Sequence, residues 1–486
     1  MHKIAGLDVT KNKILRASLL AASASLLPAG LAAQSAAQSA SQSAAQSPGD
    51  GQPENLIPPE APEIVSEPVE AEPDVVVSNP VVQAIDAMAE QRKPLIQDWN
   101  LEQARALAAI VEGIGEEGLV HSDYELDALR EAIAIGPDEA LDAAASKTFQ
   151  YLVEDLRDGR TPMNGRKQWF VFDPDQDRYP TGRLMADALE SGDMAGTFAR
   201  IMPEHPDYFR LKDELAATPA EDTNRRKLIR ANMDRWRWLP RDLGHQYLMT
   251  NVPEYQLRLT VNDTIVRTYR TVVGKPGRTA TPQIAESVEG VIFNPTWTVP
   301  QSIVKGEGLG ARVLADPAWG RSKGYKATKG ANGWVTVVQQ PGPSNSLGLM
   351  KLDMPNKHAI FFHDTPSRHL FNNANRALSH GCIRTENATT LAITLAILQG
   401  GLTADEGVAK LKSGKYTKVP FGKTMAAYIT YFTMAQDING ELTTFNDIYG
   451  RDQAVLDSLD APRKANRSRV TDEQVIPIEN DPRDIV

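Results

Sequence analysis

Residues 358–384 gather most of the side chains that could carry out covalent chemistry. Four of the eight histidines lie here, at His358, His363, His369 and His380, and the single cysteine, Cys382, follows two residues after the last of them. A histidine near a thiol can take its proton and leave a thiolate nucleophile. A lone cysteine near a histidine is also common as a buried, inert thiol. Spacing alone leaves both interpretations open.

The residues around the cysteine would suit acyl transfer. The stretch reads Ser379-His-Gly-Cys-Ile-Arg384. Gly381 lets the backbone approach a substrate closely and can turn amide groups toward a developing oxyanion. Arg384 adds positive charge that favours a thiolate or holds a carboxylate. A helix predicted from Asn387 to Gln399 would place its positive dipole end close to the thiol.

The histidines do not form a metal-binding pattern. Their spacings of 5, 6 and 11 residues match no His-Glu-x-x-His motif, and a single cysteine excludes both a Cys-rich zinc site and an intrachain disulfide. We therefore predict no metal ion and no cofactor.

Short apolar and alternating segments after residue 236 predict the β-structure that must position these groups. The predicted strands are 255–261, 265–273, 288–293, 335–339, 359–362, 428–433 and 442–445. Asn439-Gly440 between the last two is typical of a hairpin turn. Between 293 and 334, seven glycines and several lysines indicate an insertion rather than a continuous core.

Helical periodicity dominates residues 81–235. The predicted helices are 101–114, 122–135, 138–156, 185–202 and 208–215, several of them ending at glycine. No catalytic constellation is visible in this segment. It therefore reads as a scaffold or docking domain.

The N-terminus predicts export. Residues 1–33 combine a basic start with an Ala/Leu-rich apolar stretch, as a secretory signal peptide does, and they are too short to span a membrane. Residues 34–80 are rich in Ala, Gln and Ser, then in Pro, with eight acids and no Lys or Arg, so we expect a disordered linker. The net charge of −10 argues against nucleic-acid binding. These features together predict a periplasmic protein.

Two motifs together resemble a known family. Phe361-Phe-His-Asp-Thr-Pro-Ser-Arg-His-Leu-Phe371 followed by Ser379-His-Gly-Cys-Ile-Arg384 is similar to the signature of the YkuD-type L,D-transpeptidases, closest to their larger YcbB-like branch. Further segments resemble the same family and occur in the expected order along the chain. They are 232–240, 273–275, 281–282, 294–300, 340–348 and 447–452. The resemblance covers about 220 residues. The peptidoglycan-binding domain that larger relatives often insert before the catalytic unit has no obvious room here.

The resemblance implies an α+β architecture. A helical N-terminal scaffold domain, 81–235, would be followed by a mainly β catalytic domain, 236–455, with a capping insertion at about 300–333 and a polar C-terminal tail, 456–486. In the family this insertion covers the cysteine. We expect it to close over Cys382, with Trp319 or Tyr325 contacting either the substrate or the core of the insertion.

The resemblance also implies a mechanism. Cys382 would attack the third residue of a peptidoglycan tetrapeptide stem, with His363 as general base, and D-alanine would leave. An amine of a second stem would then resolve the thioester as a 3→3 cross-link. Ser379, His380 and Gly381 would shape the pocket and the oxyanion site, and Arg384 would hold the loop or a stem carboxylate.

Three alternatives remain open. One is an L,D-carboxypeptidase or cross-link hydrolase on the same scaffold, and the second is a non-catalytic wall-binding protein. The third, a papain-like peptidase, is disfavoured because such enzymes place cysteine before histidine. Partners beyond stem peptides would be cell-wall synthesis proteins bound through the helical domain.

Overall fold

The computed structural model describes residues 96–262, 264–465 and 468–475, which belong to one compact unit. The predicted signal peptide and linker lie outside the described residues. No helix among the described residues is long and apolar enough to cross a membrane.

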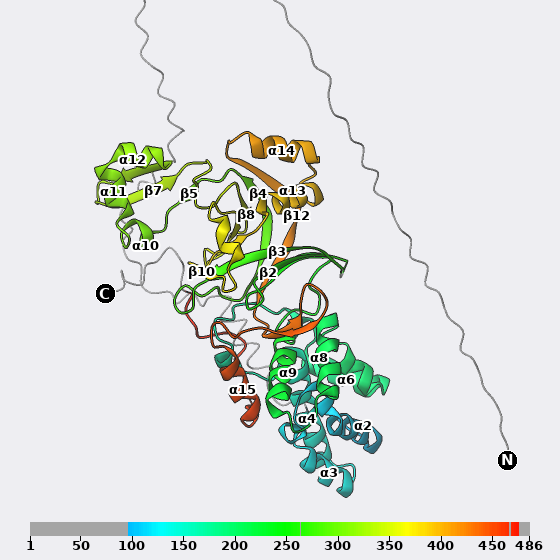
Figure 1. The fold of residues 1–486 in the computed structure, drawn as a ribbon. Helices are drawn as coiled ribbons and strands as arrows, with labels where there is room; N and C mark the ends of the chain where they lie inside the picture. The colour runs from blue at the N-terminus through cyan, green and yellow to red at the C-terminus, as the bar shows by residue number, and fades with distance from the viewer. Residues whose placement is uncertain (1–95, 263, 466–467, 476–486) are drawn as a thin grey trace, which may run out of the picture. The chain divides into compact units, whose positions relative to one another are not determined.

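The first part of the described chain is helical (Figure 1). Its helices are α2 (Leu101–Glu112), α3 (Leu126–Ile135), α4 (Glu139–Asp158), α5 (Asp175–Arg178), α6 (Thr181–Ser191), α7 (Met194–Ala199), α8 (Pro206–Ala217) and α9 (Thr223–Trp236). Short 3-10 turns are η1 (Ile114–Glu117), η2 (His121–Tyr124) and η3 (Met163–Gly165). The single helix predicted over 185–202 is wrong: Gly192 adopts a left-handed φ of 71° and separates α6 from α7.

A mixed β-sheet follows. Its strands are β1 (Gln246–Asn251), β2 (Gln256–Val261), β3 (Thr264–Gly274), β4 (Ile284–Phe293), β8 (Met350–Asp353), β9 (Phe362–His363), β10 (Ala377–Ser379), β11 (Ile383–Thr385) and β12 (Thr417–Thr430). Within the described residues their order is β10-β3-β11-β9-β8-β4-β12-β1-β2, and an added β2–β3 pairing closes the sheet into a barrel. The predicted α+β class is therefore confirmed.

Apolar side chains of the barrel strands and of one helix form a single core. Apolar residues of β2, β4, β8 and β12 form a core with α13 (Ala388–Leu398), whose Leu391 and Leu395 are fully buried. Helix α14 (Ala404–Lys412) lies beside α13. The helix predicted from Asn387 exists, but Asn387 is left-handed and its side chain makes no cap.

The helical part and the barrel share a second core. Helices α8 and α9 pack apolar residues against β1, β12 and α15 (Asp452–Asp460), which lies beside α9 in Figure 1. The predicted polar tail from 456 is wrong at its start, because α15 spans that boundary and buries Leu459. The tail then continues to Arg463, which pairs with Glu154 and Asp155 of α4.

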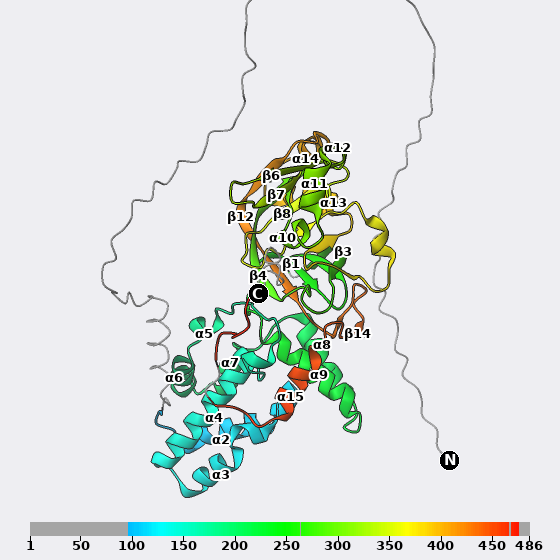
Figure 2. The same cartoon turned by 90° about the vertical axis from the view of Figure 1, so that its left-hand side faces the viewer.

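A small subdomain interrupts the barrel between β4 and β8. Strands β5 (Trp297–Thr298), β7 (Val335–Gln339) and β6 (Tyr325–Lys329) form a three-stranded sheet among the described residues. Helices α10 (Gln301–Val304), α11 (Leu309–Ala315) and α12 (Pro317–Ser322) complete it, and both ribbon views show these elements grouped together (Figure 2). Val304, Val313 and Val337 are its buried core.

A hairpin closes the catalytic part of the chain. Strands β13 (Met434–Gln436) and β14 (Leu442–Thr444) pair around Asn439-Gly440, as the turn predicts. The first partner strand is 434–436 rather than 428–433, because 428–430 belong to β12 in the barrel.

Candidate active site

Two neighbouring strands bring the candidate nucleophile and base together. Strands β9 and β11 are parallel, with Arg384 beside His363 and Ile383 beside Phe362. Cys382 directly precedes β11, and the positive charge of Arg384 acts on both the Cys382 thiol and the His363 imidazole. The thiol donates to the carbonyl oxygen of Ala359 at 3.5 Å.

A backbone carbonyl orients the imidazole of His363. Its Nδ1 lies 2.5 Å from the carbonyl oxygen of Asp364. A carbonyl only accepts, so Nδ1 carries the proton and Nε2 is left as the basic nitrogen. The Asp364 carboxylate fixes the main chain at this point, because it accepts from the Leu349 amide at 2.9 Å and pairs with Arg368 at 3.3 Å. The orienting partner is thus a main-chain atom, which leaves no side-chain signature in the sequence.

The environment favours an uncharged pair in the free protein. Burial, with Arg384 and Lys351 adding positive charge, lowers the pKa of His363 to about 3. Burial raises the pKa of the Cys382 thiol, and Lys351 and Arg384 only partly oppose it. A neutral imidazole can accept the thiol proton when substrate binds, which is what a general base requires.

The loop before Cys382 is held by its own polar groups. The Ser379 hydroxyl donates to the Cys382 carbonyl at 2.6 Å and accepts from the Gly381 amide at 3.1 Å. Gly381 has φ 116°, a conformation that L side chains rarely adopt. Because the Gly381 amide is engaged, the Cys382 amide is the better candidate for an oxyanion donor.

A second hydrogen-bonded chain braces this loop from behind. Thr281 Oγ1 donates to the Gly381 carbonyl at 2.8 Å and accepts from the Gly274 amide at 2.9 Å. Tyr449 donates to the Gly274 carbonyl at 2.6 Å and accepts from the Thr281 amide at 3.2 Å. A Cβ on Gly274 would lie 1.9 Å from the Thr279 carbonyl oxygen and 3.0 Å from Gly381 Cα. The sequence motifs at 273–275, 281–282 and 447–452 therefore meet here, although residue types alone assign them no role.

The capping subdomain approaches this loop at His380, whose pKa is lowered by burial, so its imidazole is neutral at pH 7. His380, which is more than half exposed, lies 3.9 Å from Glu307. Trp319 and Tyr325 stack with their ring centroids 6.0 Å apart and pack on the core of the subdomain. Their contacts are therefore those of subdomain core residues.

The remaining histidines of the motif lie apart from the reacting pair. His369 is exposed in η4 (Arg368–Asn372). His358 is buried against Phe170, with ring centroids 4.5 Å apart. Among the described residues, no cluster of three or more His, Cys, Asp or Glu side chains could hold a metal ion.

Comparison with known proteins identifies two segments. Residues 245–403 match the L,D-transpeptidase catalytic domain family, YkuD, and residues 91–215 match the Scaffold domain family. The chain is 30% identical over 251 residues to the "Putative L,D-transpeptidase" of Haemophilus influenzae. The aligned region covers 49% of this chain. The chain spans 50% of that relative's length.

Two solved structures are also similar over part of the chain. L,D-transpeptidase 1 of Mycobacterium tuberculosis is 11% identical, with 38% of this chain and 61% of that chain covered and a TM-score of 0.17. The L,D-transpeptidase of Mycobacterium smegmatis is 12% identical, with 38% and 58% covered and a TM-score of 0.18.

Proposed function

Since this chain carries a YkuD L,D-transpeptidase catalytic domain behind a Scaffold domain, we propose that it is a peptidoglycan L,D-transpeptidase that makes 3→3 cross-links. The observation that carries the proposal is the pairing of β9 with β11, which sets His363 beside Arg384, two residues from Cys382, while the proton on Nδ1 leaves Nε2 as the basic nitrogen. We propose the periplasm as the compartment of the reaction, because the N-terminal sequence predicts an export signal.

Acylation begins with proton transfer from Cys382 to Nε2 of His363. The thiolate attacks the carbonyl carbon of the third stem residue, and the Cys382 amide stabilises the oxyanion. The C–N bond to D-alanine then breaks as His363 returns the proton to the leaving amine. The product is a thioester on Cys382 and free D-alanine.

Deacylation runs the same proton relay in the opposite sense. A side-chain amine of a second stem attacks the thioester carbonyl, and His363 takes the proton that the amine loses. The C–S bond breaks, an amide forms, and the proton returns to the thiolate. Water in place of the amine would give the hydrolase or carboxypeptidase alternative with no change in residues.

Incubation of the protein with sacculi rich in tetrapeptide stems, followed by muropeptide analysis, tests the proposal. We expect 3→3 dimers and released D-alanine, and we expect a carbapenem to add one covalent equivalent at Cys382. Cys382→Ala should fold, take no adduct and make no dimers. Tripeptides without dimers would identify a hydrolase, and dimers from Cys382→Ala would overturn the mechanism.

We further propose that the capping subdomain is a substrate lid. Its support is the approach of Glu307 to His380 and the independent core around Val313 and Val337. Replacing residues 301–332 by a short Gly/Ser linker should leave the barrel folded. The variant should lose cross-linking of sacculi and react with a small alkylating reagent at least as fast as the wild type. Unchanged cross-linking, or slower alkylation, would reject the lid.

A further inference from the structure

A cleft lies beside the catalytic loop, and Gly381 of that loop lines it. Its other walls come from the loop after β3, through Arg278, from the segment before β9, through His358, and from two segments outside the matched catalytic domain. Those two contribute Phe170 and Gln474. The cleft therefore reaches Gly381, the residue before Cys382, and is built by five separated parts of the chain.

The segment around Phe170 is held on the barrel by main-chain bonds. The Phe170 amide donates to the Gln283 carbonyl at 2.8 Å, and the Gln283 amide donates to the Gln168 carbonyl at 2.9 Å. The Gln168 amide donates in turn to Glu473, which fixes the segment that carries Gln474. The cleft is thus a preformed feature rather than a gap between loose loops.

His358 supplies an unused polar group to this cleft. The residue is 2% exposed, and its Nε2 has no hydrogen-bond partner among the described residues. A buried polar atom without a partner costs about 1–3 kcal/mol, so such atoms are usually kept for a ligand or water. Phe170 packs against the ring and holds it in place.

The cleft also favours an anion. Its lining includes Arg278 and no Asp or Glu, and Arg278 has no carboxylate partner among the described residues. Glu473, which neighbours Gln474 in the chain, is engaged by the Gln168 amide, and Glu307 lies 3.9 Å from His380, which also lines the cleft. An arginine with free donors beside a neutral imidazole suits a carboxylate.

We propose that this cleft binds the C-terminal carboxylate of the donor stem, that of the D-alanine which leaves. The inference rests on the proposed function, because it assumes that the third-residue carbonyl reaches Cys382. The leaving residue is then one residue from the thiol, next to Gly381. A stem extended by a further residue has an amide at this position, so the cleft would select tetrapeptide over pentapeptide donors.

Peptide binding to the Cys382→Ala protein tests the site without turnover. The probes are a tetrapeptide stem with a free terminal carboxylate, its terminal carboxamide, and the same stem amidated only on the third-residue side chain. We expect the free acid and the side-chain amide to bind about 10- to 100-fold more tightly than the terminal amide, as for a hydrogen bond to a charged group. Equal affinity for the free acid and the terminal amide would overturn the proposal. A loss of affinity on amidation of the third-residue side chain, with none on amidation of the terminus, would overturn it too.

Variants then locate the effect. Added to Cys382→Ala, Arg278→Gln should abolish the preference for the acid, Arg278→Lys should retain part of it, and His358→Phe should weaken it. Arg105→Gln, at an exposed arginine of α2, is the matched control and should change nothing. A preference that survives Arg278→Gln would overturn the assignment. Selective binding by a protein that makes no cross-links would reject the proposed function alone.

Discussion

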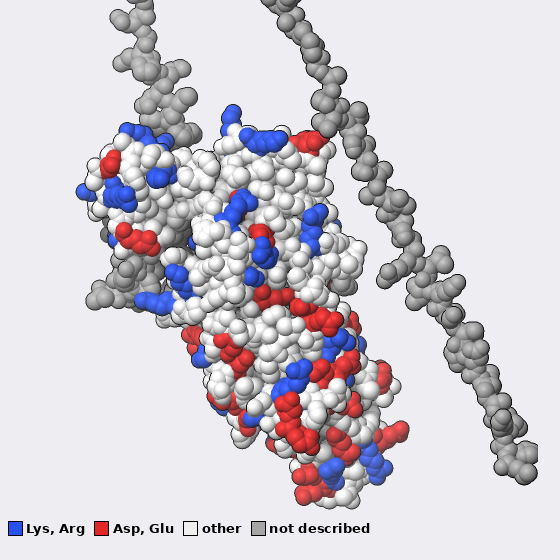
Figure 3. All heavy atoms as spheres, viewed as in Figure 1, with Lys and Arg blue, Asp and Glu red and all other residues white. Residues whose placement is uncertain are grey.

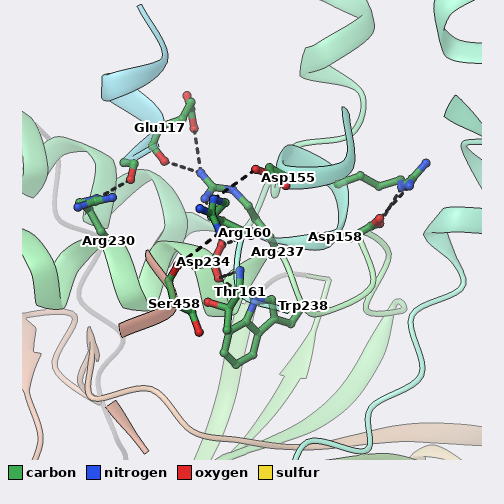
Figure 4. Close-up of polar contacts among 12 residues, drawn as sticks. Glu117, Asp155, Asp158, Arg160, Thr161, Arg230, Asp234, Arg237, Trp238 and Ser458 are labelled. Carbon is green, nitrogen blue, oxygen red and sulfur yellow. Dashed lines mark hydrogen bonds and ion pairs between the residues drawn. The ribbon is translucent and has the colours of Figure 1, made fainter. Parts of the chain in front are cut away.

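Two buried polar clusters of this molecule contain similar side chains but serve different roles, one in stability and one in catalysis. The scaffold cluster consists of Glu117, Asp155, Arg160, Asp234 and Arg237 (Figure 4). It joins η1, α4 and α9, and Arg160 also donates to the Ser458 carbonyl of α15. Its charges meet one another: Arg237 lies 3.7 Å from Asp234, and Arg160 lies 3.7 Å from Asp155. Asp234 also accepts from the Arg160 amide at 2.6 Å. Burial alone would raise the pKa of Asp234, but Arg237 and these hydrogen bonds lower it.

The catalytic cluster is left incomplete. It consists of Cys382, His363 and Arg384. Among the described residues, Arg384 Nε has no hydrogen-bond partner, and Arg384 faces no carboxylate. Burial lowers the pKa of His363 and of Arg384 and raises that of Cys382. Arg237 Nε of the scaffold cluster also has no hydrogen-bond partner among the described residues, but its charge is matched by carboxylates within the fold, which stabilises it. The charge of Arg384 has no such match in the part of the chain that the structure describes and can meet a substrate carboxylate.

The same contrast extends to the surface. Residues 96–235 hold 17 Lys and Arg against 28 Asp and Glu, whereas residues 236–455 hold 24 against 16. Lys and Arg gather over α11 and α12 of the capping subdomain in Figure 3, with few acids between them. Peptidoglycan stems carry carboxylates, so the basic surface lies on the part of the chain that we propose meets them.

The largest expected effect is on the catalytic cluster. His363→Gln keeps a side chain of similar size but removes the base, and we expect the cross-linking rate to fall about 10²- to 10⁴-fold. His369→Gln, at an exposed site, should retain near-wild-type activity. Rates are measured by D-alanine release from tetrapeptide donors. Equal losses in the two variants would mean that His363 is not the base.

The scaffold cluster should respond in stability instead. Asp234→Ala removes one of the two carboxylates beside the buried Arg237 and leaves the Arg160 and Thr161 amides without their acceptor, and we expect a loss of about 3–5 kcal/mol in the free energy of unfolding. The matched control is Asp213→Ala, at an exposed aspartate of α8, which should change it by less than about 0.5 kcal/mol. Denaturant unfolding measures both. Similar losses in the two variants would remove the contrast between the clusters.

The smallest expected effect concerns the thiol itself. Because the pKa of Cys382 is raised and that of His363 lowered, the pair is neutral at pH 7, and alkylation should accelerate through and beyond the pH range of an ordinary thiol. Arg384→Gln removes a charge that lowers the thiol pKa and should slow alkylation at pH 8 by about two- to tenfold. A rate that levels off well below pH 8 would instead indicate a thiolate–imidazolium pair.

Much of the site could be predicted from the sequence because it depends on residues that are close together in the chain. The motif Ser379-His-Gly-Cys-Ile-Arg384 identifies the reactive thiol and its loop. The motif includes Gly381, whose φ of 116° is one that L side chains rarely adopt. Asn439-Gly440 specifies its hairpin for the same reason, since turn geometry depends on neighbouring residues. The periodicity of α4 and of β2 likewise needs no distant contact to be recognised.

Only the tertiary structure decided how these pieces act together. The strand predicted at 359–362 is β9 at Phe362–His363 instead, because Ala359 turns to φ 53° and offers its carbonyl to the thiol. The tautomer of His363 depends on one main-chain oxygen, and the brace behind Gly381 depends on Thr281 and Tyr449. A main-chain acceptor is the same whatever the residue type, and contacts between residues 100 or more positions apart leave no periodic pattern in the sequence. Local pattern therefore predicts the reactive side chains, and the closed barrel determines their chemistry.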